Sequence, residues 1–290
     1  MTTAQRVIKY FAYGLAAIIV FVIIGGITAA GAGILTAVGV ISRGAPEAEV
    51  DCSQYEKCLS LQLSHSELYI KKGGSEIKIE SSDNDYEVVR NDTNVVIKDT
   101  KKSSWFGNNN RKLTVTVPEN MKFESVGISS GAGRIDVESI ATKELKMSLG
   151  AGETIIHNIE ATEKVKISSG AGKLAVEDGV MKDADIDLGV GETSIRAEII
   201  GDSKINAGIG SVKLDLLLPE SEYTIKADKG IGEIRFNGSS VSDNSTIGNG
   251  ENKINVDGGI GEINIKTATE KKETEDKAED KTKEKKELEE

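Results

Sequence analysis

The segment Val126-Gly-Ile-Ser-Ser-Gly-Ala-Gly-Arg-Ile-Asp-Val137 returns almost unchanged as Val165-Lys-Ile-Ser-Ser-Gly-Ala-Gly-Lys-Leu-Ala-Val176. On both sides of a Gly-apolar-Gly triplet, apolar residues alternate with polar ones, which is the period of a half-buried strand. Each unit therefore predicts a strand, a corner and a second strand. The glycines supply the unusual φ values of a sharp bend, and we expect the residue between them to point into the core. The triplet recurs about every 20 residues, with the glycine pairs Gly131 and Gly133, Gly150 and Gly152, Gly170 and Gly172, Gly189 and Gly191, Gly208 and Gly210, Gly230 and Gly232, and Gly259 and Gly261.

One such unit buries too few apolar side chains to offset the entropy lost when its backbone is ordered, so neighbouring units must share a core. The composition, with 31 Gly, 3 Pro and 4% aromatic residues, suits a thin repetitive core better than a thick globular one. We therefore predict an all-β fold over residues 66–266, a β-solenoid (single-stranded β-helix-like) of stacked ~20-residue coils. The last unit, at Gly259, is expected to cap the stack, and the irregular stretch 237–252 is expected to be a loop.

A column of mostly charged residues follows the corner by two positions. Because strands in stacked coils lie about 4.8 Å apart, opposite charges at this position predict an exposed ladder of ion pairs that favours the correct order of coils. The alternative is a cation site built from the carboxylates, which the interspersed basic residues disfavour. The column consists of Arg134, Glu153, Lys173, Glu192, Ser211, Glu233 and Glu262.

A long apolar segment precedes the repeats. No residue from Tyr10 to Ser42 is charged, and this run exceeds the ~20 residues that a transmembrane helix needs. We predict a retained transmembrane helix at residues 10–42, preceded by a cytoplasmic tail at 1–9. The alternative is a signal peptide cleaved near Ala30-Gly31-Ala32, but the apolar run continues past that point.

The charges that flank this segment predict its orientation. Arg6 and Lys9 precede the apolar run, whereas acidic residues follow it from Glu47 onward. The positive-inside rule then predicts a single-pass protein of the cell membrane with its C-terminal domain outside the cytoplasm.

Within the apolar segment, Gly25, Ala29, Gly33 and Ala37 recur every fourth residue. This spacing lines small side chains on one helix face and permits self-association of the helix. The alternative is the general abundance of Gly and Ala in membrane helices.

Two further segments flank the repeats. Residues 43–65 are interpreted as a linker in which Cys52 and Cys58 can form a disulfide if the domain lies outside the cytoplasm; two free thiols are the alternative. Residues 267–290 are almost entirely Lys, Glu, Asp and Thr, so we expect a disordered charged tail or a transient helix.

The sequence offers little material for catalysis or cofactor binding. The two histidines, His65 and His157, have no nucleophile or metal-ligand spacing around them, and alternation places His157 on the outside of a strand. The net charge of -11 disfavours a nucleic-acid partner. We therefore expect no enzyme activity, no cofactor and no metal site. The exposed aromatic pair Trp105-Phe106 could contact a membrane surface or glycan, or could cap the first coil.

The set formed by the early strands around 76–90, the segment Leu113-Thr-Val-Thr-Val-Pro118 and the Ser-Ser-Gly-Ala-Gly units resembles the bacterial putative-adhesin domain family. The resemblance covers most of residues 67–266. It implies a membrane-anchored β-solenoid repeat domain of unknown function, with relatives linked to Lia-type cell-envelope stress systems, and it implies no catalytic residues. The expected function is a non-enzymatic extracytoplasmic interaction module in the cell-envelope stress response, with an unknown envelope protein or glycan as partner. The alternatives are a surface adhesin that binds glycan or matrix and, third, a carbohydrate-active enzyme.

Overall fold

The computed structural model describes residues 50–82, 84–91, 93–100 and 111–269. Contacts divide the chain after Gly44, and all described residues lie in the second unit, Ala45–Glu290. The expected segments at 1–9 and 10–42, the helix face at Gly25 and the aromatic pair Trp105-Phe106 fall outside the described residues. So do residues 270–290 of the tail expected over 267–290, whereas its first two residues, Thr267 and Ala268, belong to strand β19. Within those residues, no helix has the length and apolar character needed to cross a membrane.

The described part is all-β, with two short 3₁₀ helices. Its elements in chain order are η2 Cys52–Gln54, β1 Cys58–His65, β2 Glu67–Lys72, β3 Lys78–Ser81, β4 Tyr86–Arg90, β5 Asn94–Asp99, β6 Lys112–Val117, β7 Phe123–Val137, β8 Ile140–Ile156, β9 Ile159–Val176, β10 Gly179–Lys182, β11 Ala184–Ile200, β12 Asp202–Asn206, β13 Ile209–Pro219, η3 Glu220–Glu222, β14 Tyr223–Asp228, β15 Ile231–Phe236, β16 Ser239–Ser240, β17 Ser245–Gly248, β18 Asn252–Asp257 and β19 Ile260–Ala268.

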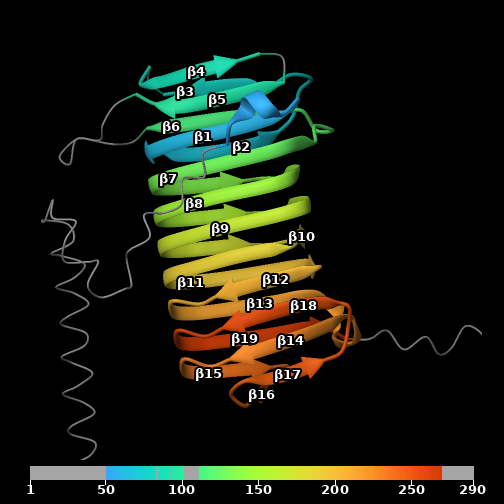
Figure 1. Cartoon of the computed structure of the whole chain (residues 1–290). Coiled ribbons are helices and arrows are strands. Elements are labelled where there is room, and N and C mark those ends of the chain that lie inside the picture. Colours follow the sequence, from blue (N-terminus) through green and yellow to red (C-terminus); the bar gives the residue numbers. More distant parts are fainter. Residues whose placement is uncertain (1–49, 83, 92, 101–110, 270–290) are drawn as a thin grey trace, which may run out of the picture. The chain divides into compact units, whose positions relative to one another are not determined.

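The middle of the domain is a β-solenoid-like stack in which each unit lies directly on the previous one (Figure 1). Strands β7, β8, β9, β11 and β13 pair in parallel and in register. Equivalent repeat positions face each other, so that Gly133 lies beside Gly152 and Gly152 beside Gly172. The predicted unit is therefore present, although β7, β8, β9 and β11 each run through the corner as one long bent strand.

The interior is filled by the inward-facing columns. Ile128, Met147, Ile167 and Ile186 are aligned by strand pairing across four successive units and are at most 2% exposed. Most of the stabilisation must come from such columns, because each is completed only by the units above and below it.

Both ends of the stack depart from chain order. At the N-terminal end, β1 pairs with β5 on one side and β7 on the other. At the C-terminal end, β19 lies between β13 and β15. The prediction that the last unit caps the stack is therefore wrong: that unit is internal, and β15 lies outside it.

Short strands close both ends of the stack (Figure 1), and each pairs antiparallel with its neighbour. At the N-terminal end, β4 pairs with β5 and β3 with β6. At the C-terminal end, β17 pairs with β14 and β16 with β15. The stretch 237–252, expected as a loop, thus contains the two strands of the C-terminal cap.

The solenoid also begins earlier than expected, because β1 belongs to it and the linker expected over 43–65 ends before Cys58.

Candidate interaction surface

The corners owe their shape to close contact between neighbouring backbones. A Cβ atom at Gly150 would lie 2.0 Å from the carbonyl oxygen of Gly131, and one at Gly189 would lie 1.9 Å from that of Gly170. The second glycine of each corner has a positive φ, for example +142° at Gly191, which L side chains rarely adopt. The first glycine of each corner is thus required by space, and the second by both space and backbone conformation.

The residue between the two glycines points outward, contrary to the sequence-based expectation. Val190, Ile260 and Ile231 are 38%, 42% and 74% exposed, and Ile209 is half-buried. Pairing of Val190 with Ile209, Ile209 with Ile260 and Ile260 with Ile231 places the four side chains in one continuous line across β11, β13, β19 and β15. We call Val190, Ile209, Ile260 and Ile231 the corner ridge. In the other half of the stack, the equivalent positions are the alanines Ala132, Ala151 and Ala171.

The charge ladder beside the corner is formed in part. Arg134 Nη1 lies 2.8 Å from Glu153 Oε2, and Lys173 Nζ lies 3.8 Å from the other Glu153 oxygen. All three side chains are at least a third exposed, so each pair contributes only about 0–1 kcal/mol. The non-sequential order of the coils then places Ser211 beside Glu262 and Glu262 beside Glu233. The ladder of opposite charges does not extend into this half.

Carboxylates therefore border the corner ridge. Glu192, Glu262 and Glu233 lie two residues beyond Val190, Ile260 and Ile231, respectively. A hydrogen bond from Arg235 holds the pKa of Glu233 below its usual range, with Nη2 2.9 Å from the carboxylate oxygen.

His157 is exposed but not simply solvated. Its Nδ1 lies 2.7 Å from Glu177 Oε2, and its Nε2 lies 3.3 Å from Asp136 Oδ1. The hydrogen bond with Glu177 is the main cause that raises the pKa of His157 above 6.5. The three side chains come from successive coils, so protonated His157 ties three layers together.

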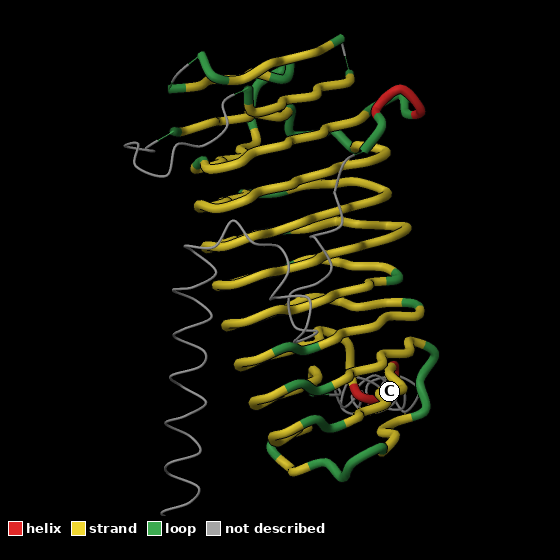
Figure 2. Tube along the Cα trace, turned by 60° about the vertical axis from the view of Figure 1, so that its left-hand side comes forward, coloured by secondary structure: helices red, strands yellow, loops and turns green. Residues whose placement is uncertain are grey.

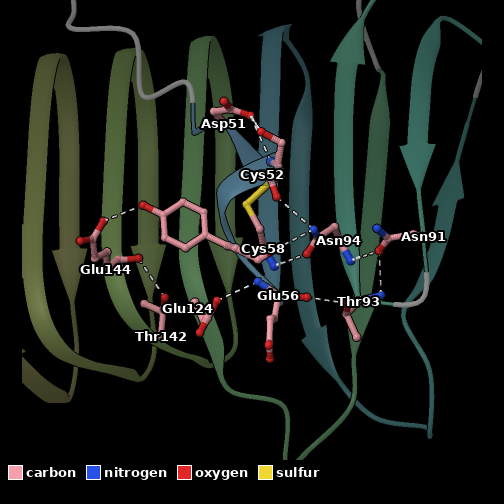
Figure 3. Close-up of a disulfide and its surroundings, with 12 residues drawn as sticks. Asp51, Cys52, Glu56, Cys58, Asn91, Thr93, Asn94, Glu124, Thr142 and Glu144 are labelled. Atoms are coloured by element: carbon pink, nitrogen blue, oxygen red, sulfur yellow. Dashed lines mark hydrogen bonds between the residues drawn. A yellow bond between two sulfur atoms is a disulfide. The ribbon is translucent and has the colours of Figure 1, made fainter.

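A disulfide joins Cys52 to Cys58, whose Cα atoms are 5.4 Å apart (Figure 3). Asn94 secures this segment: its side chain donates to the Cys52 and Tyr55 carbonyls at 3.0 and 2.9 Å and accepts from the Cys58 N–H at 2.9 Å. Tyr55 donates its hydroxyl hydrogen to Glu144 of β8, with an Oη to Oε2 distance of 3.2 Å. The segment before β1 is therefore clamped to the N-terminal coils.

The described residues offer no evident catalytic centre. No group of three His, Cys, Asp or Glu side chains in this part of the chain could hold a metal ion. His65 is half-buried at the corner position of β1, opposite Ala132, and its Nδ1 has no hydrogen-bond partner among the described groups. His65 is the last residue of β1, whereas His157 lies in the turn after β8, so the fold does not bring the two histidines together.

Sequence reasoning missed the corner ridge, the carboxylates around His157 and the Tyr55 clamp. The ridge had a detectable signal, because the apolar residues Ile260 and Ile263 are three apart and cannot both point to the same side of an extended strand. Glu177 had a signal too, because it follows His157 by one repeat and therefore takes the equivalent position in the next coil.

A family model described as Toastrack DUF4097 matches residues 57–287. The chain belongs to this family. Two solved structures resemble the Toastrack chain: a putative cell adhesion protein from Clostridium sporogenes, at 19% identity over 76% of this chain and 96% of that one with a TM-score of 0.34, and a putative adhesin from Bacteroides fragilis, at 15% identity over 74% and 95% with a TM-score of 0.36. No curated protein matches the Toastrack chain. The family match confirms the resemblance to a domain family of unknown function.

Proposed function

We propose that this protein is a non-enzymatic interaction module, anchored in the cell membrane by residues 10–42 and exposed outside the cytoplasm, and that it binds its partner along the corner ridge. The observation that carries the proposal is the line of Val190, Ile209, Ile260 and Ile231 on the surface of a domain whose other aliphatic columns are buried. Contiguous exposed apolar side chains rimmed by polar ones are typical of an interaction site.

The rim indicates the chemistry of the partner. Glu192, Glu233 and Glu262 present carboxylates beside the ridge, and Arg235 is the cation that lies closest to two of them. A partner that offers an apolar groove edged by basic groups would bury the ridge and complement the rim.

The extracytoplasmic setting is supported by the uncharged run 10–42, the basic residues Arg6 and Lys9 before it, and the disulfide between Cys52 and Cys58. In this setting, the proposed role is in the cell-envelope stress response, with an envelope protein as partner. The second role, a surface adhesin for glycan or matrix, uses the same ridge against a different partner.

The test is a variant in which the four ridge residues become threonine, which keeps β-branching but removes apolar surface. Cells that lack the wild-type gene would carry either the variant or the native chain. We expect the variant to reach the native level and melting temperature but to lose resistance to envelope-active antibiotics. Loss of attachment to glycan- or matrix-coated surfaces, with resistance intact, would favour the adhesin role instead.

Ile155→Thr serves as the matched control. Ile155 is half-buried and faces outward between the buried Thr154 and Ile156, away from the corner ridge. This control should behave as the native chain in both assays. If the ridge variant retained both activities, or if the control lost them equally, the ridge would not be the binding surface.

A further inference from the structure

Strand β4 forms the outermost layer at the N-terminal end of the stack (Figures 1 and 2). Among the described strands it pairs only with β5. Its adjacent residues Val88 and Val89 are 41% and 60% exposed. Apart from the corner ridge, no other large apolar side chains of the described residues are so exposed.

The hydrogen-bonding pattern leaves an open edge on β4. Asn91 donates its N–H to the Asn94 carbonyl at 3.0 Å, where the antiparallel pair begins. Bonded pairs alternate along such a ladder, so Val89 directs its backbone groups toward β5, whereas Val88 and Arg90 direct theirs away from it. An uncovered edge of this kind is a template for another strand.

The sequence of β4, Tyr86-Glu-Val-Val-Arg90, is suited to pairing with itself. In an antiparallel pair centred on Val88, that residue faces the partner's Val88, and the two residues exchange their outward-directed N–H and C=O hydrogen bonds. Glu87 then lies opposite the partner's Val89, so the pair places no like charges directly opposite each other. We propose that two copies of this chain associate through an antiparallel β4 pair with its two-fold axis at Val88.

The other end of the stack is poorly suited to the same contact. Its outer strands β16 and β17 have only two and four residues and carry mostly Ser, Thr and Gly. At the N-terminal end, β3 has four residues and carries the ion pair between Lys78 and Glu80, at 2.6 Å. Short and charged edges resist pairing. The β4 edge therefore favours a closed dimer over a filament, since a two-fold contact uses the same patch on both copies.

Cysteine cross-linking of the full-length protein in detergent tests this geometry. In the proposed pair, the two Val88 Cα atoms are about 5.5 Å apart, within the range of a disulfide. The two Val89 Cα atoms are about 8 Å apart, beyond that range. Val88→Cys should give a covalent dimer on a non-reducing gel, whereas Val89→Cys, although more exposed, should remain monomeric. The native cysteines are already bonded to each other.

Proline substitutions test the same edge without a cross-link. Val88→Pro removes an N–H that faces away from β5, so we expect loss of the dimer in sedimentation velocity with an unchanged melting temperature. Val89→Pro removes an N–H that faces β5 and should lower the melting temperature.

Equal cross-linking of Val88→Cys and Val89→Cys, cross-linking of neither, or a Val88→Pro protein that stays dimeric would overturn the proposal. The ridge threonine variant should cross-link through Val88→Cys like the native chain, so this test stands apart from that of the ridge.

Discussion

Three glycine-to-alanine variants separate the two reasons for glycine at the corners. Gly238 has φ +83° and no atom within 4 Å of an added Cβ, so Gly238→Ala tests backbone conformation alone. At Gly189 the added Cβ would lie 1.9 Å from the Gly170 carbonyl oxygen, without a positive φ. Gly191 combines φ +142° with a distance of 1.8 Å to the Gly172 oxygen.

The magnitudes follow from these distances. Alanine in a left-handed conformation costs about 1–2 kcal/mol, partly offset by the reduced entropy of the unfolded chain, so Gly238→Ala should lower the free energy of unfolding by about 1 kcal/mol. A Cβ contact below 3.0 Å requires something to shift, and at Gly189 the neighbouring backbone must move by about 1 Å. That displacement stretches the adjacent inter-coil hydrogen bonds beyond bonding distance, at about 1 kcal/mol each. We expect a loss of about 3 kcal/mol for Gly189→Ala and about 4 kcal/mol for Gly191→Ala.

The assay is urea denaturation followed by circular dichroism, with the slope of the transition checked for two-state behaviour. The expected order of destabilisation is Gly191→Ala, then Gly189→Ala, then Gly238→Ala. If Gly189→Ala were no more destabilising than Gly238→Ala, close packing between neighbouring backbones would not be the reason for glycine at the first corner position.

The remaining predictions concern the core, the disulfide and pH. Ile167, which is fully buried, should tolerate Ile167→Val at a cost of about 1 kcal/mol, whereas Ile167→Asp should unfold several coils together and abolish the cooperative melt. Replacing both Cys52 and Cys58 with alanine should remove about 2 kcal/mol of local stability, seen as faster proteolysis before β1 with the main melting transition nearly unchanged; a large fall in that transition would contradict the local role. Because the folded-state pKa of His157 is raised, its stabilising contribution is complete below the unfolded pKa of about 6.5 and is lost as pH rises through the folded value. The side chain is 44% exposed, so His157→Gln should cost only a few tenths of a kcal/mol at pH 5.5 and nothing at pH 8.5, and an equal cost at both pH values would exclude this titration.

The repeat unit and its register were predictable because identical units stack most stably when like positions coincide. Gly133 beside Gly152 and Ile167 beside Ile186 follow directly from that rule. The direction of the corner residue was misjudged because apolar character was taken to mean burial. Ala132 and Ile135 lie three residues apart, so both cannot face inward from one extended strand, and the glycine corner turns the first of them outward.

The stacking order of the coils could not be predicted from the sequence, for a different reason. Units that share the same columns can each stack on any other, so the repeat pattern does not encode which neighbours pair. The connections set the order of the coils: the segment 237–252, which contains β16 and β17, returns the chain so that β18 lies between β12 and β14, and β19 between β13 and β15. The N-terminal end uses the same device, with β1 held between β5 and β7.

These interlocked ends also bear on how the stack resists fraying. In a strictly sequential stack, the last coil of the chain contacts one neighbour and can detach alone. Here, β19 is hydrogen-bonded on both sides, and so is β1, so neither can leave without breaking two parallel pairings at once. The layers that remain at the outside are held by hairpin-like connections to short antiparallel strands. At the C-terminal end those strands are short and polar, whereas at the N-terminal end β4 keeps an open edge with two exposed valines. The two ends are thus built alike for stability but differ in what they offer to a second chain.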